Sequence, residues 1–421
     1  QMELVNKFDN ALAGVTGDGG STGVVVNSGN RQTTGHYWVM QACPDEKAHS
    51  HEPTGDQHDK TQLNIGDEAP EGVDALAGRI LAMFGPTRGF VAPAYVPGPH
   101  CNTRGLTALG KHLITAMVDK GMIVDPDHMS AAAQRSALDL LQTTVAPRER
   151  ARAAKAKQPA RRPALISSHS WGNDVIYQRI YALDGVVAPR TANATTFSDS
   201  WAQHKAWAAA NAPKGYDFGL GYGADTNGLG GQPGPRSKPR TKLAYPQAGW
   251  RAPIGGVTLR QQRSGLKSFD INRDGVAQYG MFADWYQELQ LAADEKHAAQ
   301  GGGKAILADM LNGAETYLSM WERGVYGAND CVRDGSMPQL EDLHAALGLN
   351  VEGFLTAIGQ PSSRDGSAYR YCAQGKDGEP TVVDVQFDTA GTASGVRPAV
   401  DASVHAAGVT APAIVGPATG G

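Results

Sequence analysis

Short apolar runs that alternate with helical segments constrain the fold of this chain more than any other feature. Four such runs follow Asn102, at residues 122–128, 164–170, 185–189 and 216–225. Apolar strands that alternate with helices are typical of βα units, which form a parallel sheet. The sequence therefore predicts an α/β fold that binds its ligand at the carboxyl edge of the sheet.

The segments between these runs have the spacing and end signals of helices. Thr107 can cap a helix over 108–121, where Leu109, Leu113 and Met117 recur on one face and Gly121 ends the run. Further helices are expected at residues 130–144, 174–184, 198–212, 279–298 and 304–324. This alternation covers most of the chain after Asn102.

Both ends of the chain differ from this alternating region. Residues 14–105 are loop-rich, with strands expected at 23–27 and 36–40 and an amphipathic helix at 72–85. The tail predicts a strand at 381–387 and then a flexible end. We therefore expect two parts. Residues 1–325 hold the alternating units with the loop-rich insertion, and residues 326–421 form a C-terminal extension with a small helical and β segment.

Polar side chains stand at the ends of the apolar runs. His128 and His169 follow consecutive expected strands, and Asp225 ends a later one. Neighbouring strands lie about 5 Å apart, so the two imidazoles are expected to be close enough to share one ion. Imidazole is a common zinc ligand, and a carboxylate at the same edge can move protons. The pattern predicts a metal-dependent catalytic site; histidines packed for structural reasons are the alternative.

Four strings that carry these residues resemble one protein family when they are taken in order. They are GLTALGKHLITAMVDKGMIVDPDHMS, ISSHSW, GYGADTNG and FDINRDGVAQYGMFADWYQEL. Together they resemble the membrane (renal) dipeptidase family of the amidohydrolase superfamily, particularly large secreted actinobacterial members. The likeness covers residues 1–325. It implies a metal-dependent (β/α)8 TIM-type barrel with two bridged zinc ions, where a metal-bound hydroxide cleaves an amide bond of a small peptide-like substrate.

The resemblance also assigns roles to single residues. His128 and His169 match the two imidazole ligands of one metal, and Asp225 matches the carboxylate that handles the proton and contacts the substrate amine. Arg179 lies near the position of the arginine that binds the substrate carboxylate, although a helix-surface arginine is an equal reading. Asn6 replaces the family's substrate-contacting histidine, which weakens the expectation of dipeptide specificity.

Part of the family's metal site does not occur in the matched order. The family's other ligands are a His-x-Asp or His-x-His after the first strand and a bridging Glu after the third, whereas QMELVNKFDNAL resembles the segment after that Glu. The resemblance therefore implies the C-terminal half of the barrel, about strands 4–8. A second polypeptide carrying the N-terminal half and the second metal's ligands is expected to complete a processed two-chain enzyme.

Two further motifs resemble metal-binding motifs, but the sequence around each favours another interpretation. His49 and His51 have the spacing of a first-strand metal motif, but no apolar strand precedes them, so a polar loop is the better reading. The string from Asp270 to Gly275 starts like an EF-hand loop, yet its twelfth position is Met281 rather than Glu. Neither is expected to bind the catalytic metal or calcium.

Two other functions stay open beside amide hydrolysis. The same centre could hydrolyse an acyl-amino acid, a lactone or a lactam with a different pocket. Alternatively, a decayed barrel could serve as a non-catalytic binding or assembly protein, which Asn6 and the missing first-half ligands favour.

Composition limits the location and the partners of the chain. The four cysteines, an even number without a CxxC pair, favour two disulfides and secretion over buried free thiols. Of the three possible connectivities, Cys43–Cys101 and Cys331–Cys372 are favoured because they close local loops.

The absence of an 18-residue apolar run argues against a membrane span. The basic stretch 148–162 lacks interleaved aromatics and the net charge is −4, so no nucleic-acid partner is expected.

Overall fold

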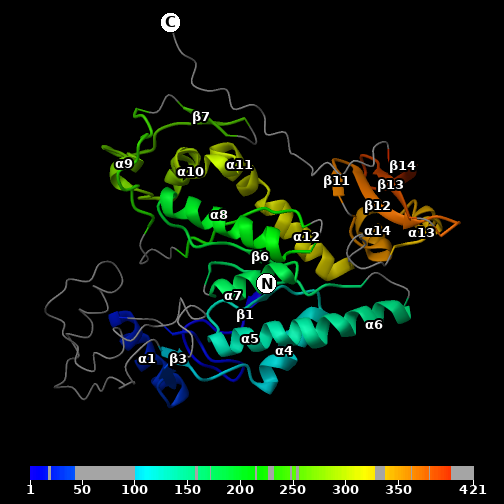
Figure 1. Ribbon diagram of the computed structural model, residues 1–421, viewed down its shortest axis with the longest axis horizontal. Coiled ribbons are helices and arrows are strands. Elements are labelled where there is room, and N and C mark those ends of the chain that lie inside the picture. The colour runs from blue at the N-terminus through cyan, green and yellow to red at the C-terminus, as the bar shows by residue number, and fades with distance from the viewer. Residues whose placement is uncertain are drawn as a thin grey trace, which may run out of the picture. The chain divides into compact units, whose positions relative to one another are not determined.

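The structure is a computed structural model of a mixed α/β protein (Figure 1). It describes residues 1–17, 20–42, 100–156, 160–170, 172–213, 216–225, 232–246, 249–252, 256–327, 337–361, 363–378 and 380–399. The chain divides into two compact units. The first comprises the described residues of Gln1–Val187, Ala210–Tyr216 and Tyr317–Ser403, and the second those of Ala188–Ala209 and Asp217–Thr316. The predicted α/β class is confirmed, and no sheet among the described residues closes into a barrel.

Four short parallel strands lie side by side in the first unit. Strand β1 (Met2–Glu3) pairs with β4 (Val124–Asp125), and β5 (Ile166–Ser167) pairs with β6 (Val186–Val187). A parallel bridge between Val124 and Leu165 joins the two pairs. The last three of these strands are the apolar runs expected from the sequence, in the expected order, and all three are buried.

Helices connect these strands, as the spacing of apolar residues predicts. Helix α4 (Ala108–Asp119) begins where Thr107 accepts a hydrogen bond from the Gly110 amide, and Gly121 follows its end with φ 67°. Between β4 and β6 follow the helices α5 (Ala131–Leu140), α6 (Ala146–Ala156) and α7 (Asp174–Ala182). A π-helical turn at Leu141–Val145 joins α5 to α6, so part of the basic stretch is helical.

The expectation of a strand at 23–27 is wrong. These residues belong to α1 (Gly20–Thr34), which is followed by a short antiparallel pair, β2 (Met40–Ala42) and β3 (His100–Asn102). Tertiary contacts explain the helix. The Asn27 side chain accepts a hydrogen bond from the Trp38 amide, and the Asn30 side chain accepts one from the Asp9 amide. Side chains three residues apart lie on the same face of a helix, so a helical segment lets Asn27 and Asn30 make both hydrogen bonds. These two contacts outweigh the β preference of the three valines.

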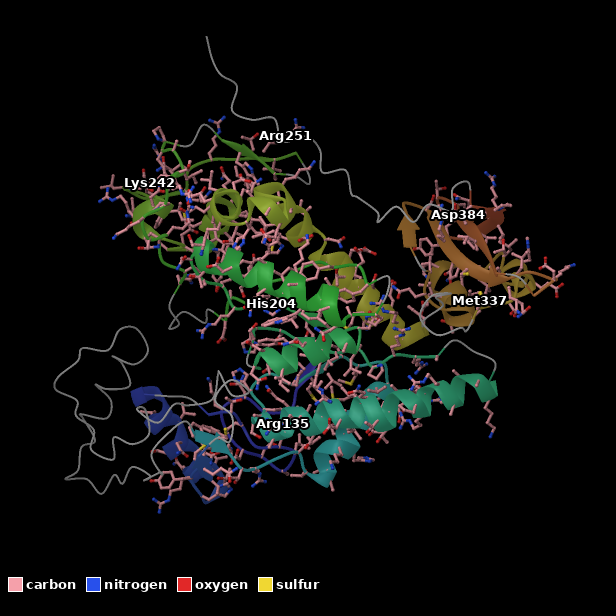
Figure 2. All side chains as sticks on the ribbon, viewed as in Figure 1. Arg135, His204, Lys242, Arg251, Met337 and Asp384 are labelled. Carbon is pink, nitrogen blue, oxygen red and sulfur yellow. The ribbon has the colours of Figure 1, made fainter. Side chains whose placement is uncertain are left out.

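The C-terminal part of the first unit has its own apolar core. Two helices, α13 (Leu340–Ala345) and α14 (Val351–Ile358), precede an antiparallel sheet in the order β11-β12-β13-β14. These strands span Ser363–Asp365, Ala368–Gln374, Pro380–Phe387 and Ala393–Pro398. The expected strand at 381–387 is therefore confirmed. Phe354 and Tyr371 are fully buried in this core. Asp384, which Figure 2 labels on the sheet, forms a bidentate ion pair with Arg370 on the neighbouring strand.

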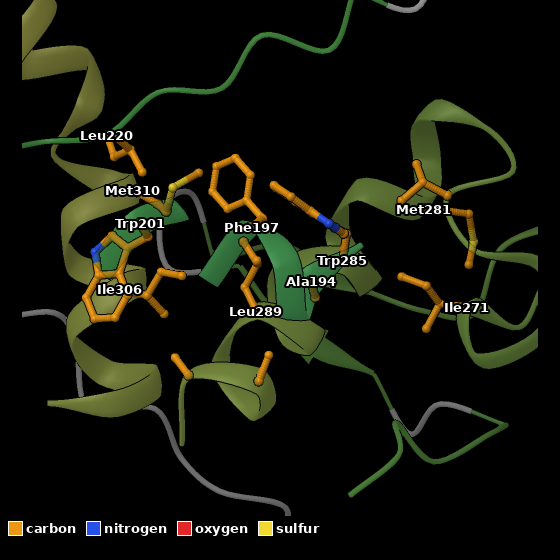
Figure 3. Packing of buried hydrophobic residues seen from close by; sticks show 13 residues of the cluster. Ala194, Phe197, Trp201, Leu220, Ile271, Met281, Trp285, Leu289, Ile306 and Met310 are labelled. Carbon is orange, nitrogen blue, oxygen red and sulfur yellow. The ribbon is translucent and has the colours of Figure 1, made fainter. Parts of the chain in front are cut away.

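The second unit is mainly helical around an apolar core in which Phe197, Trp201 and Trp285 are the buried aromatic residues (Figure 3). Helix α8 (Ala194–Asn211) begins in it and contributes Phe197 and Trp201, which pack with Trp285 of α10 (Phe282–Lys296). Helix α11 (Gly302–Leu311) packs beside α10 and adds Ile306 and Met310 to the same core. Smaller elements are β7 (Trp250–Arg251), β8 (Thr258–Leu259), β9 (Arg263–Ser264), β10 (Lys267–Ser268) and α9 (Ile271–Asp274).

The helix expected over 304–324 is two helices. Helix α11 ends at Leu311 and α12 (Gly313–Tyr326) starts after Asn312. At the break, a Cβ atom on Gly313 would lie 2.9 Å from the Leu220 carbonyl oxygen, so only glycine lets the segment around Leu220 pass so closely. The tertiary contact thus explains why glycine stands at the break.

Some expectations fall outside the described residues. These are the helix at 72–85, the pair His49 and His51, and the chain end after residue 399. Cys101 and Cys372 are buried and disulfide-bonded, but Cys43 and Cys331 lie outside the described residues, so the proposed pairing stays a prediction. Among the described helices, none has the length and apolar character that a membrane crossing requires.

Candidate metal centre

The two histidines singled out from the sequence lie against each other. His128 follows β4 and His169 follows β5, and their Nε2 atoms are 2.8 Å apart. The ring centroids are 4.7 Å apart, and the residues are 3% and 9% exposed. At this distance one imidazole donates an Nε2–H to the lone pair on the Nε2 of the other. The parallel pairing of the strands therefore creates a buried point on which both Nε2 atoms converge.

Glu3 is a third member of the centre that sequence reasoning missed. It ends β1 and stands in register with Asp125 of β4. One ligand atom from each of Glu3, His128 and His169 lies within 4.8 Å of the other two. Glu3 lies inside the short apolar run at 2–5, for which the sequence predicts no strand. Counting it as one would have found this carboxylate.

Serine and aspartate side chains surround His169. Asp127 Oδ2 accepts the His169 backbone N–H at 2.8 Å and lies 3.1 Å from His169 Nδ1. Ser167 donates to Asp127 Oδ1 at 2.7 Å. The Ser168 hydroxyl lies 2.9 Å from His169 Nδ1 and 3.4 Å from Glu3 Oε1. The Nδ1 side of the ring therefore faces oxygen atoms, and the Nε2 side faces His128.

The centre is rich in negative charge. Burial, helped by the neighbouring charges of Asp127 and Glu3, raises the pKa of the Asp125 carboxyl to about 7. Burial also acts to raise the pKa of Asp127, but hydrogen bonds and the charge of His169 outweigh it, so the pKa of Asp127 is lowered. Several carboxylates close together in a buried position favour the binding of a cation.

The backbone is left-handed at the centre. His128 has φ 63° and Ser170 has φ 64°, although neither is glycine. Such a conformation costs roughly 1–3 kcal/mol for a residue with a Cβ atom, and it persists where the surrounding structure imposes it. Each residue lies three positions after the end of a strand, so the left-handed backbone occurs at His128 and at the residue that follows His169.

The spacing of the two imidazole nitrogens is compatible with a zinc ion. Two nitrogens bound to one tetrahedral zinc at about 2.0–2.1 Å lie about 3.3–3.4 Å apart. The observed 2.8 Å between the Nε2 atoms therefore requires an opening of roughly half an ångström, within the reach of small side-chain rotations. Two histidines and one glutamate are also the ligand set of well-known zinc peptidases, which keep a fourth position open.

The other residues named from the sequence are not members of the group of Glu3, His128 and His169. Asp225 belongs to the second unit, is exposed and has φ 45°. Two residues before it, Gly223 forms an isolated parallel β-bridge with Arg190. Arg179 lies on α7 and forms an ion pair with Asp139 at 2.7 Å. Asn6 donates to Glu3 Oε2 at 3.2 Å. Asn6 therefore borders the centre, whereas Arg179 is engaged on a helix surface.

In the EF-hand-like string, carboxylate oxygens of Asp270 and Asp274 make local contacts. Asp270 Oδ1 accepts hydrogen bonds from the backbone and the side chain of Asn272. Asp274 pairs with Lys267 at 2.7 Å and accepts the Asp270 backbone N–H. These contacts form a capped turn at the start of α9.

No protein-family model and no curated protein matches the chain. The likeness to the dipeptidase family stays a prediction from the quoted strings.

Proposed function

We propose that this protein is a zinc-dependent hydrolase that cleaves an amide bond of a small peptide-like substrate. The observation that carries the proposal is the convergence of Glu3, His128 and His169, from three neighbouring parallel strands, on one buried point. Of the described residues, no other group of three or more such side chains could hold a metal ion. The dipeptidase-like strings supply the reaction class.

Three protein ligands suit a catalytic rather than a structural ion. Zinc in such a site polarises a carbonyl group and lowers the pKa of water to about 7. The chain's own residues prepare the centre: His128 and His169 direct Nε2 lone pairs at it, and Glu3 adds a carboxylate that Asn6 and Ser168 hold by hydrogen bonds. The assignment of proton transfer to Asp225 rests on the sequence alone.

The proposal differs from the sequence expectation in one respect. The sequence predicted that this chain holds only part of the metal shell. With Glu3, one chain offers a complete three-ligand set for a single ion. A mononuclear site is therefore the simplest form of the proposal, and a second metal would need further ligands.

A second polypeptide that completes a barrel is part of the same proposal. In the described parts of the chain, β1 pairs with β4 and with no other strand, so it is the edge of the parallel run. Parallel sheets are usually covered on both faces, and a free edge is a place where another strand can add. Copurification from the native source and mass spectrometry would identify such a polypeptide.

Metal content and turnover together test the proposed function. The purified protein is loaded with zinc and assayed against dipeptides, acyl-amino acids and lactones, with metal measured by atomic emission. We expect one zinc ion per chain and amide hydrolysis, both abolished in His128→Ala and in His169→Ala. His112→Ala, at an exposed position on α4, is the matched control and should keep both.

Each other outcome has a definite meaning. Cleavage of acyl-amino acids or lactones alone would move the substrate class and keep the metal centre. Absence of bound zinc in the wild-type protein at micromolar free zinc would reject the metal centre and favour a binding or assembly role. Full turnover in both histidine variants would reject the site.

A further inference from the structure

We infer that Asp127 is a positioning residue that fixes the His169 imidazole in the tautomer with the proton on Nδ1, so that the Nε2 lone pair faces the metal point. The inference rests on the proposed function for the identity of the ion. The state of the ring can nevertheless be measured without any metal.

The carboxylate of Asp127 is held in one orientation by donors on both oxygens. Oδ1 accepts the Ser167 hydroxyl at 2.7 Å, and Oδ2 accepts the His169 backbone N–H at 2.8 Å. Asp127 is fully buried, and the Asp127 backbone N–H itself donates to Asp125 Oδ1 at 3.2 Å. A carboxylate with fixed donors on each side cannot rotate toward another partner.

This orientation determines what Asp127 can offer to the imidazole ring. Oδ2 lies 3.1 Å from His169 Nδ1, and an ionised carboxylate only accepts hydrogen bonds. A favourable contact therefore requires a proton on Nδ1. In a neutral imidazole the other nitrogen then carries a lone pair, and Nε2 is the atom that faces His128 Nε2 at 2.8 Å.

The remaining oxygen neighbours of Nδ1 agree with this assignment. The Ser168 hydroxyl at 2.9 Å can accept as well as donate, and Glu3 Oε1 lies farther away, at 3.5 Å. Asp127 is also a poor candidate for a direct ligand, because both of its oxygens already accept short hydrogen bonds. Its role is therefore to orient the ring.

Carboxylates that accept the second N–H of a metal-bound histidine raise the basicity of the ligand. Removal of such a partner usually weakens metal affinity by about 10- to 100-fold. Asp127→Asn keeps the shape of the side chain but removes the charge, and its amide group can donate to Nδ1 and thus favour the opposite tautomer. We expect zinc to bind this variant about 10- to 100-fold more weakly.

The first measurement uses the wild-type protein without metal. Nitrogen-15 labelling of the histidines and a long-range proton–nitrogen spectrum report which ring nitrogen is protonated, and the His169→Gln variant assigns the signal. A protonated Nδ1 on His169 is expected at pH 7.5. A ring protonated on Nε2 alone would overturn the inference, whether or not the protein proves to be an enzyme.

The second measurement compares matched variants. Zinc affinity is obtained by competition with a chromophoric chelator for the wild type, Asp127→Asn and Asp139→Asn. Asp139 is an exposed carboxylate in the same unit, paired with Arg179, and its variant should bind zinc as the wild type does. Affinity of Asp127→Asn within about twofold of the wild type, while His169→Ala loses zinc, would overturn the positioning role.

The two measurements distinguish a failure of the proposed zinc-dependent function from a failure of the role assigned to Asp127. If no variant and no wild-type protein binds zinc, the proposed function fails, and the tautomer of His169 still decides the role of Asp127. If Asp127→Asn does not fold, the wild-type spectrum alone decides.

Discussion

The buried carboxyl of Asp125 should make the free energy of unfolding of the metal-free protein depend on pH. Asp125 is fully buried beside the candidate centre, where its carboxyl accepts from the Gln1 side chain and the Asp127 backbone. Burial, with the charges of Asp127 and Glu3, raises the pKa of Asp125 from its ordinary 3.8 to about 7. The replacement Asp125→Asn keeps the shape and removes the ionisable group.

The direction of the effect follows from proton linkage. Between pH 4 and pH 7 the folded state holds a proton on Asp125 that the unfolded state has released. The free energy of unfolding contributed by this group is therefore largest at low pH and falls as pH rises through this window. With a folded pKa of about 7, the fall between pH 5 and pH 8 is on the order of 2–3 kcal/mol. Asparagine at this position has no such dependence.

Urea unfolding in the presence of a chelator measures the effect. The free energy of unfolding is determined at pH 5 and pH 8 for the wild type and for Asp125→Asn, with Asp139→Asn as an exposed control. Relative to the wild type, Asp125→Asn should gain about 2–3 kcal/mol on going from pH 5 to pH 8, and the control should gain none. A constant difference between Asp125→Asn and the wild type at both pH values would refute the reasoning, because any change in packing is independent of pH.

Two further predictions concern the candidate centre and its assigned partner. Zinc affinity should fall about tenfold or more from pH 7.5 to pH 5.5, because protons compete for the His128 and His169 lone pairs; calorimetric titration measures this, and an affinity independent of pH would contradict imidazole ligation. Asp225→Asn should lower turnover by about 10²-fold or more while the zinc content stays at the wild-type level, since the sequence assigns it proton transfer. Wild-type turnover in that variant, measured in a steady-state assay, would remove Asp225 from the mechanism.

Local signals in the sequence determined much of the first unit. The cap at Thr107 and the stop at Gly121 delimit α4, and both act within a few residues of the helix they end. The pairing of His128 with His169 was also predictable, because parallel strands joined by a helix become neighbours and their carboxyl ends share one edge. Periodicity and breakers are properties of short segments, so the sequence displays them directly.

Other features were decided by tertiary structure. Three consecutive valines favour a strand, yet α1 is a helix because Asn27 and Asn30 must reach backbone amides of two separate segments. Glu3 belongs to the centre only because β1 pairs with β4, far along the chain. Asp127 orients His169 only because β4 and β5 are adjacent. Contacts between distant segments leave no periodic pattern in either segment, so the strand edge and its ligand set emerge only when the chain has folded.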